Sequence, residues 1–432
     1  MIINMKGDSR FRYCRKITFY IQIIIGGYCT VKKVFIVSAK RTPIGSFLGS
    51  LKNVSASELG AVLVKNIIEE NKLNPAEIDE VIVGNILPAG QGQGIARQVA
   101  IKGGVPIEVP AYSINIACGS GMKAVMNALT SIRAGFSNLI IAGGVESMSN
   151  APYLVPASTR NGFKMGEMKL VDHMIFDALT DAFDGIHMGI TAENIAEKYG
   201  IAREQQDKVA AESQRKAIEA IDAGRFKDEI VPVKVKMGKE EVLFDTDEYP
   251  NRKTNFEKLS GLKPAFKKDG TVTAGNASGI NDGGSMMLIA SEEAIEKYNL
   301  TPLAEIVGIG QGGVDPKVMG LGPTPAIRNA LNNAGLKLKD MDVIELNEAF
   351  AAQALGVVHE LSEEHGITEE EILNRTNPNG GAIALGHPVG ASGNRIMVTL
   401  LHEMLKGNMQ YGLASLCIGG GMGTAVVLKS VK

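Results

Sequence analysis

The feature of this chain that most restricts its fold is an internal duplication of strands and helices. In the first half, apolar β-rich runs such as "VFIVSA" and "IDEVIVGNIL" alternate with helical stretches such as "SASELGAVLVKNIIEENKL", with Ser57 as the expected helix cap. The second half repeats this order: "GPTPAIRNALNNAGLKLKDMDVIELNEAF" parallels residues 57–85, and Asp342 takes the place of Asp79. Strands that alternate with helices indicate a mostly parallel sheet covered on both faces. We therefore predict an α/β fold with a duplicated core.

A long insertion interrupts the first of the two repeats. The run "MGTAVVLKS", which ends at Ser430, parallels "GGSMMLIAS", which ends at Ser291. This closing strand follows the glycines at once in the second repeat, but it comes only after Ser278 in the first. Residues 150–278 are therefore predicted to be an inserted loop domain. The predicted organisation is a leader at residues 1–30, an N-terminal half at 31–301 that contains the insertion, and a C-terminal half at 302–432.

The first thirty residues differ from the rest of the chain in composition. They combine a basic start with an apolar run from Ile17 to Ile25, which is too short to span a bilayer as a helix. A signal peptide, a transit peptide and a mistakenly translated stretch ahead of the coding start are three interpretations. We favour the last, because "VKKVFIVSAKRTPIG" from Val31 resembles a natural start. The leader is expected to be absent from the native protein and to take no part in the fold.

Charge and cysteine usage exclude several classes of function. The formal net charge of the 432-residue chain is -2, so bulk electrostatics does not favour nucleic-acid binding. Hydrophobic residues make up 45% and charged residues 21%, as in ordinary globular proteins. The four cysteines form no CxxC pair and no Cys/His cluster, which argues against a zinc site or a disulfide framework. We expect a reducing, cytoplasmic compartment, no bound metal and no membrane partner.

Cys118 is a candidate nucleophile because it stands where a strand meets a helix, in "NIACGSGMKAV". Backbone N–H groups at a helix N-terminus favour negative charge, so the thiol is expected to have a lowered pKa. The glycines behind Cys118 let a substrate approach the backbone closely. The alternative is a buried structural cysteine, which is the commonest fate of a free thiol.

His387 and Cys417 occupy turns of the second repeat that correspond to this position. His387 precedes the helix that matches the one behind Cys118, so a pseudo-twofold core would bring the two residues to facing edges. Cys417 ends the strand "GLASLC" and faces three glycines. A hydrolase needs only one thiol, whereas a second thiolate could remove a proton from the carbon next to a thioester carbonyl. Glycine N–H groups could form an oxyanion hole, and Asn347 in "ELNEAF" could hold a water or a carbonyl oxygen.

Four segments together carry a resemblance to a known family. "NIACGSGMKAV", "LNEAFAAQA", "GGAIALGHPVGASG" and "CIGGGMGTA" closely resemble the thiolases, in particular their acetyl-CoA acetyltransferases, and the likeness runs from about Val34 to the C-terminus. The resemblance implies a layered αβαβα core in a homotetramer (a dimer of dimers) or a dimer. It also implies reversible Claisen condensation of two acetyl-CoA to acetoacetyl-CoA and CoA, with CoA thioesters as substrates and no separate cofactor.

The same resemblance assigns roles to the residues of the glycine turns. Cys118 would carry the acyl group, and His387 would accept its proton. Cys417 would be the acid and base at the α-carbon. Asn347 would hold a water that completes one oxyanion hole with His387, and the N–H groups of Cys118 and Gly419 would form the other.

The insertion resembles the family's CoA-binding loop domain. The implied binding residues are Leu179 towards the adenine, His187 and Met188 along the pantetheine and acyl pocket, Ala274 and Ser278 against the pantetheine arm, Met319 in the pocket and Arg252 at the 3′-phosphate. The last assignment departs from the pattern, because some members have arginine two residues after "DEY" where this chain has Asn251.

The histidine of "HMG" and the bulky Met188 and Met319 favour a short-chain enzyme. Four alternatives remain open at this point: a 3-ketoacyl-CoA thiolase of broad chain length, a β-ketoacyl synthase, a Cys–His acyl-CoA hydrolase and a non-catalytic CoA- or lipid-binding protein. A synthase would by resemblance carry His or Asn where this chain has Cys417.

Overall fold

The strand order of the structure shows the duplication directly. The computed structural model describes residues 32–431, and the predicted leader lies outside them. The first half supplies β1 (Val34–Arg41), β3 (Glu80–Gly84), β5 (Leu139–Ser147) and β10 (Asn281–Ser291). The second half supplies β11 (Ala304–Gly313), β12 (Val343–Leu346), β13 (Tyr411–Ile418) and β14 (Met422–Ser430). In both halves one parallel pair, β3–β5 or β12–β13, is followed by two antiparallel pairings. The structure confirms the duplicated core.

The two halves meet at the edges of their sheets. β1 pairs with β11 only through Phe35–Glu305 and Ile36–Ala304, which joins the strands in the order β12-β13-β14-β11-β1-β10-β5-β3-β4. β4 (Ala111–Ile114) lies parallel to β3. Its counterpart in the second half is reduced to an isolated bridge between Ile344 and Thr376. A short β2 (Gly45–Ser46) pairs with the start of β10.

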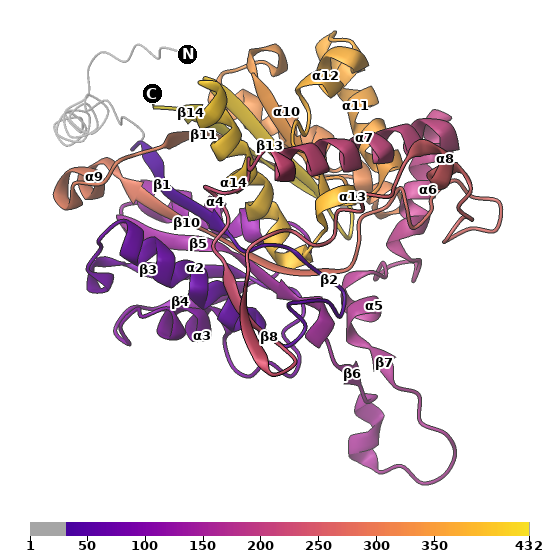
Figure 1. The fold of residues 1–432 in the computed structure, drawn as a ribbon, viewed down its shortest axis with the longest axis horizontal. Helices are drawn as coiled ribbons and strands as arrows, with labels where there is room; N and C mark the ends of the chain where they lie inside the picture. Colours follow the sequence, from indigo (N-terminus) through magenta and orange to yellow (C-terminus); the bar gives the residue numbers. More distant parts are fainter. Residues whose placement is uncertain (1–31, 432) are drawn as a thin grey trace, which may run out of the picture. The chain divides into compact units, whose positions relative to one another are not determined.

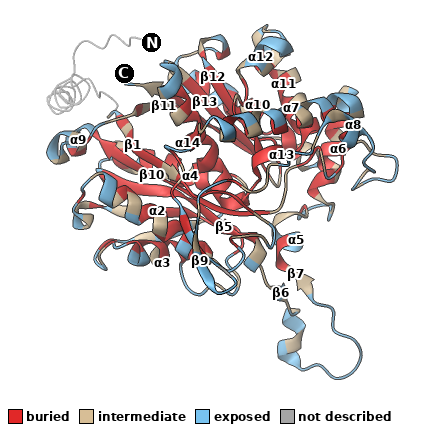
Figure 2. Ribbon diagram, viewed as in Figure 1, coloured by how far each residue is buried: buried red, intermediate tan, exposed pale blue. Residues whose placement is uncertain are grey.

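Helices form three layers around the two half-sheets. The first half is covered by α2 (Ala56–Glu70) and α3 (Ile95–Lys102), and the second by α10 (Pro323–Ala334) and α11 (Ala351–His365). Between the halves lie α4 (Ser120–Arg133) and α14 (Val389–Gly407). α14 is buried on all sides from its first residue to Leu401, as a helix in a central layer must be. Figure 2 shows this contrast with the half-exposed α2 and α3. The layered αβαβα arrangement is therefore confirmed (Figure 1).

The expected cap of the first helix was wrong by two residues. Ser55, not Ser57, caps α2, and its hydroxyl accepts a hydrogen bond from the N–H of Glu58. The Glu58 side chain accepts in return from the N–H of Ser55, which completes a capping box. The spacing of three residues to Glu58 therefore selects Ser55 as the cap.

The connection between β5 and β10 differs most between the halves. Asp282 of β10 pairs directly with Ser147 of β5, although more than a hundred residues separate them in sequence. Only Gly419, Gly420 and Gly421 separate the equivalent β13 and β14. The long connection contains β6 (Tyr153–Leu154), β7 (Val171–Asp172), α5 (His173–Ala178), α6 (Met188–Tyr199), α7 (Arg203–Asp222), β8 (Val233–Met237), β9 (Glu240–Phe244) and α8 (Phe256–Ser260). Figure 1 shows β6 and β7 at the base of an arm that extends away from the sheets.

Short elements complete the described chain. They are α9 (Glu292–Tyr298), α12 (Glu369–Arg375), α13 (Ala382–Leu385) and the 3-10 helices Pro75–Glu77, Met148–Asn150, Ala157–Asn161, Pro316–Leu321 and Leu338–Asp340. Within residues 32–431, no helix is long and apolar enough to cross a membrane.

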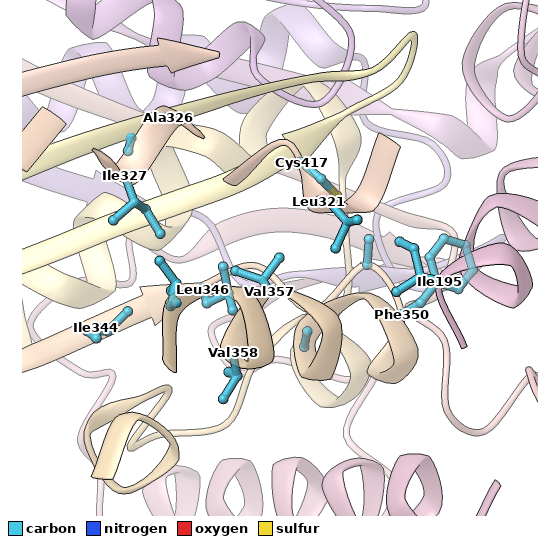
Figure 3. Packing of buried hydrophobic residues seen from close by; sticks show 14 of the residues in the cluster. Ile195, Leu321, Ala326, Ile327, Ile344, Leu346, Phe350, Val357, Val358 and Cys417 are labelled. Atoms are coloured by element: carbon cyan, nitrogen blue, oxygen red, sulfur yellow. The ribbon is translucent and has the colours of Figure 1, made fainter. Parts of the chain in front are cut away.

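An apolar cluster connects the second half to the insertion. Figure 3 shows Cys417 of β13 beside Leu321, with Ile195 of α6 and Phe350 close by. Leu346 of β12 belongs to the same buried cluster. Because these contacts join α6 to the sheet, the insertion forms part of the wall around Cys417.

Candidate active site

A cavity of about 500 Å³ collects almost all of the residues that the sequence selects. Its lining includes Cys118, His387, Cys417, Gly419, Leu179, His187, Met188, Ala274, Ser278 and Met319. These residues come from both repeats and from the insertion. Asn347 and Arg252 are the two predicted residues that do not line the cavity.

The loop that carries Cys118 is held in a strained conformation. Ala117 has φ +42°, in the left-handed region that residues with a side chain rarely adopt. The Ser120 hydroxyl stabilises this loop, because it accepts from the N–H of Ile116 at 2.9 Å and donates to the carbonyl of Ala117 at 2.7 Å. Strain of this kind concentrates at functional sites. The turn presents Cys118 to the cavity immediately before α4.

The expected lowered pKa of Cys118 is wrong. Burial raises the pKa of this thiol to about 11 and outweighs the hydrogen bonds that the sulfur accepts from the N–H groups of Gly419 and of Cys118 itself. The Glu146 carboxylate nearby also raises this pKa. The loop places the partly buried sulfur against apolar side chains, and the loss of hydration exceeds the effect of the amides. Cys118 rests as a neutral thiol and needs a base to become a nucleophile.

The reactivity of Cys118 should follow this raised pKa. The rate of its alkylation by iodoacetamide is expected to increase with pH up to about 11, because the thiolate fraction grows tenfold per pH unit below the pKa. Short pulses at graded pH, followed by mass spectrometry of the Cys118 peptide, measure this rate. In denatured protein the same rate should level off near pH 8.5, the ordinary thiol value. A plateau below pH 8 in the folded protein would contradict the expectation.

Cys417 and Gly419 reach the same point from β13. Gly119 has no side chain, and a Cβ there would lie 2.3 Å from the Cδ1 of Ile418, so any larger residue would have to displace the Ile418 side chain where the two turns pack together. Burial, with a further contribution from Cys118, raises the pKa of the Cys417 thiol well above its ordinary range. The two thiols therefore sense each other's charge in one water-poor site.

The hydrogen bonds of His387 define its tautomer. The Ser392 hydroxyl donates its single proton to the carbonyl of Pro388 at 2.9 Å, so its oxygen accepts from Nδ1–H of His387 at 2.6 Å. This leaves Nε2 with a free lone pair. Burial, reinforced by the Arg395 cation, lowers the pKa of His387 to about 3. His387 is therefore a neutral imidazole that can accept a proton at Nε2.

Asn347 lies behind the cavity wall with an unused amide. Its backbone N–H donates to the carbonyl of Ser415 at 3.0 Å, which places it at the end of β12 beside β13. The side chain is buried, and neither its oxygen nor its nitrogen has a hydrogen-bond partner among the described residues. Buried amides normally find a partner, and a bound water is the common one. The amide thus fits the predicted role of holding a water.

Two aromatic residues that the sequence did not indicate shape the cavity. Phe266 stacks on the His187 ring at a centroid distance of 4.7 Å and meets Phe350 edge-on at 6.1 Å. A Cβ at Gly189 would lie 2.3 Å from the Phe266 ring. The glycine of "HMG" was the one available signal that a bulky group packs there. Met188, whose N–H donates to the carbonyl of Leu179 at 2.9 Å, completes this side.

Arg252 pairs with an acid and does not line the cavity. Its guanidinium forms a two-point contact with the Asp222 carboxylate at the end of α7, at 2.5 and 2.9 Å. The side chain is exposed, so this pair remains in contact with solvent. The expectation that Arg252 binds the 3′-phosphate gains no support from this arrangement.

Within the described residues, no group of three or more His, Cys, Asp or Glu side chains could hold a metal ion.

Comparison with known proteins decides the family. The thiolase N-terminal domain matches residues 34–293, and the thiolase C-terminal domain matches residues 300–430. The chain belongs to the thiolase family. It is therefore an acyltransferase, as the paired thiols suggest. A thiolase from Pseudomonas aeruginosa named acetyl-CoA acetyltransferase is 53% identical over 399 residues, which cover 92% of this chain and 99% of the relative. A probable acetyl-CoA acyltransferase of Staphylococcus aureus is also 53% identical, over 93% of this chain and all of that protein.

Solved thiolase structures share the fold. The acetyl-CoA acetyltransferase of Bacillus anthracis has a TM-score of 0.88 and 43% identity, and the match covers 93% of this chain and 99% of that one. Human mitochondrial 3-ketoacyl-CoA thiolase has the same TM-score with 45% identity, over 93% of this chain and all of the human one. The same human thiolase was also solved in complex with CoA. Thiolases of both names therefore resemble this chain to the same degree.

Proposed function

We propose that this thiolase is an acetyl-CoA C-acetyltransferase that joins two acetyl-CoA into acetoacetyl-CoA and CoA, reversibly. The observation that carries the proposal is that two thiols, the partly buried Cys118 and the buried Cys417, line one cavity with a neutral histidine. A hydrolase would need no second thiol beside the nucleophile. The names of the relatives from Pseudomonas aeruginosa and Bacillus anthracis also support it.

The first half-reaction uses Cys118 and His387. The Cys118 sulfur attacks the carbonyl carbon of acetyl-CoA while its proton passes to Nε2 of His387. The tetrahedral oxyanion then collapses, the bond to the CoA sulfur breaks, and CoA leaves with the proton from His387. The N–H groups of Gly419 and Cys118, which the resting sulfur already accepts from, supply donors for negative charge in this step.

The second half-reaction uses Cys417. After CoA has left, the Cys417 thiol passes its proton to His387. As a thiolate, Cys417 then takes a proton from the methyl group of a second acetyl-CoA, and the resulting carbanion attacks the acetyl group on Cys118. The carbon–sulfur bond to Cys118 breaks, the Cys118 sulfur takes the proton held on His387, and acetoacetyl-CoA leaves with both thiols and His387 neutral again. Burial disfavours the charged thiolate and so raises its affinity for a proton. Such a strong base suits removal of a proton from carbon. The unpartnered amide of Asn347, behind the cavity wall, supports a role in holding a water for this step.

The bulk around the thiols supports a short acyl group. Met188 and Met319 are buried in the cavity wall, and Phe266 and Phe350 close the same side. A longer chain has to displace these side chains. The broad-chain alternative keeps one supporting observation, the equal likeness to human mitochondrial 3-ketoacyl-CoA thiolase.

Thiolysis of 3-ketoacyl-CoA substrates of graded length tests the proposal. We expect kcat/KM to be highest for acetoacetyl-CoA and to fall at least about tenfold for a substrate four carbons longer, since crowding by even one methylene costs about 1–3 kcal/mol. Met319→Ala should reduce that difference, because it removes bulk from the wall. Equal rates for all lengths would favour the broad-chain thiolase, and acid release without CoA would favour a hydrolase.

The homotetramer and the cytoplasmic location stay predictions.

A further inference from the structure

One fully buried acid beside the cavity, Glu146 of β5, has no part in the steps described above. Its Oε1 accepts from the side-chain amide of Asn85 at 2.8 Å and from the N–H of Leu87 at 3.2 Å. Its Oε2 accepts from the N–H groups of Ile86 and Gly390, each at 3.0 Å. All four partners are donors, so the ionised carboxylate is the form that fits them.

The bond to Gly390 reaches the helix that follows His387. Gly390 is the second residue of α14, where backbone N–H groups have no partner within the helix. Glu146 supplies the missing acceptor from a different strand. A Cβ at Gly390 would lie 2.5 Å from Oε2, so this approach requires glycine. The turn that Glu146 holds also contains Ser392, whose hydroxyl accepts from the His387 ring.

The other bonds of Glu146 reach the surroundings of Cys118. Ile86 and Leu87 pack in one apolar cluster with Val389, and Cys118 lies against that cluster. The first turn of α4 touches the same place, because a Cβ at Gly121 would lie 2.9 Å from the carbonyl oxygen of Gly390. Glu146 therefore contacts both the turn behind His387 and the residues behind Cys118.

We propose that Glu146 is a positioning residue that aligns His387 with Cys118 for proton transfer, by holding the first turn of α14 against residues 85–87. This inference rests on the proposed function, in which His387 takes the Cys118 proton. A misplacement of about 1 Å at such a step can lower the rate about 10²-fold. Glu146 itself touches no reacting atom.

The energetics of this carboxyl favour a functional role. Burial raises the pKa of Glu146 to about 7, and Asp282 of β10 adds to the rise, while the N–H groups of Ile86, Leu87 and Gly390 lower it. Between the ordinary pKa near 4.5 and pH 7, the folded protein therefore binds more protons here than the unfolded chain, and stability falls as pH rises. The Cys118 thiol, before α4, also senses this carboxylate, which raises the pKa of the thiol. At the pH where Glu146 is ionised and aligns the site, its carboxylate therefore lowers the free energy of unfolding.

Glu146→Gln tests the inference, because glutamine puts an NH2 group where two donors already point. We expect kcat for acetoacetyl-CoA thiolysis to fall about 10²-fold with KM unchanged, and hydrogen exchange to increase in residues 85–87 and 386–392. Activity of the unmodified enzyme should rise through pH 7 as Glu146 ionises, and this rise should disappear in Glu146→Gln. Asp79→Asn is the matched control: its carboxylate accepts from Asn138 and Leu139 at the opposite end of β5, at 2.6 and 2.8 Å, and kcat should not change.

An unchanged kcat in folded Glu146→Gln would overturn the inference, and so would an equal fall in Asp79→Asn or unchanged exchange at 386–392. If Glu146→Gln does not fold, Asn85→Ala removes a single donor and should still lower kcat, by about tenfold. An unchanged kcat in Asn85→Ala would then reject the inference. A wild-type protein that fails to cleave acetoacetyl-CoA refutes the proposed function instead, while hydrogen exchange still reports whether Glu146 holds α14.

Discussion

Replacing Cys417 with alanine is expected to lower condensation and thiolysis by at least about 10²–10⁴-fold, the usual cost of losing a general base. Acetylation of Cys118 by acetyl-CoA should survive largely intact. The reason is that attack on the first thioester needs the Cys118 sulfur, His387 and the amide donors, none of which requires the Cys417 sulfur. Only the second half-reaction needs a base at the α-carbon.

Mass spectrometry of the Cys417→Ala variant after brief exposure to acetyl-CoA is the measurement. Cys118→Ala is the matched control: it removes the other thiol of the same cavity and should show neither acetylation nor turnover. A folded Cys417→Ala protein that fails to acetylate would falsify the division of labour. That result would mean that Cys417 also activates the nucleophile.

Replacing His387 with alanine should block the reaction one step earlier. Because the Cys118 pKa is about 11, hardly any thiolate exists near neutral pH without a proton acceptor. Acetylation of Cys118 is therefore expected to fall about 10²–10⁴-fold, together with turnover. Raising the pH should restore acetylation steadily towards pH 11, because solvent can then remove the proton that His387 no longer takes.

The rate of appearance of acetyl-Cys118, followed at graded pH, separates this outcome from misfolding. His402→Ala provides the control, because His402 lies on α14, the helix that follows His387, and its Nε2–H donates to the carbonyl of Ala39 at 2.9 Å, outside the cavity. That variant should acetylate at the normal rate. An undiminished rate in His387→Ala would assign the proton acceptor elsewhere.

The sequence by itself determined the duplicated α/β core and three residues that meet in the cavity, Cys118, His387 and Cys417; the residues of the CoA pocket came only from the family resemblance. Strand and helix patterns are local, and a repeated pattern places Cys118 and His387 at equivalent positions without any knowledge of contacts. The glycines around Cys417 likewise indicate a close backbone approach. These features follow from residue type and order, so they could be predicted before the fold was known.

Only the tertiary structure decided the protonation states and the supporting contacts. The pKa of Cys118 is shifted upward, whereas a downward shift was expected. The reason is that desolvation depends on everything packed around the sulfur and not on the helix behind it. Phe266 reaches His187, and Glu146 reaches Gly390, across sequence separations that no local pattern encodes. The pairing of Arg252 with Asp222 is likewise a contact between separate segments that no local pattern encodes. Solvent exclusion and long-range pairing arise only when distant segments are packed together.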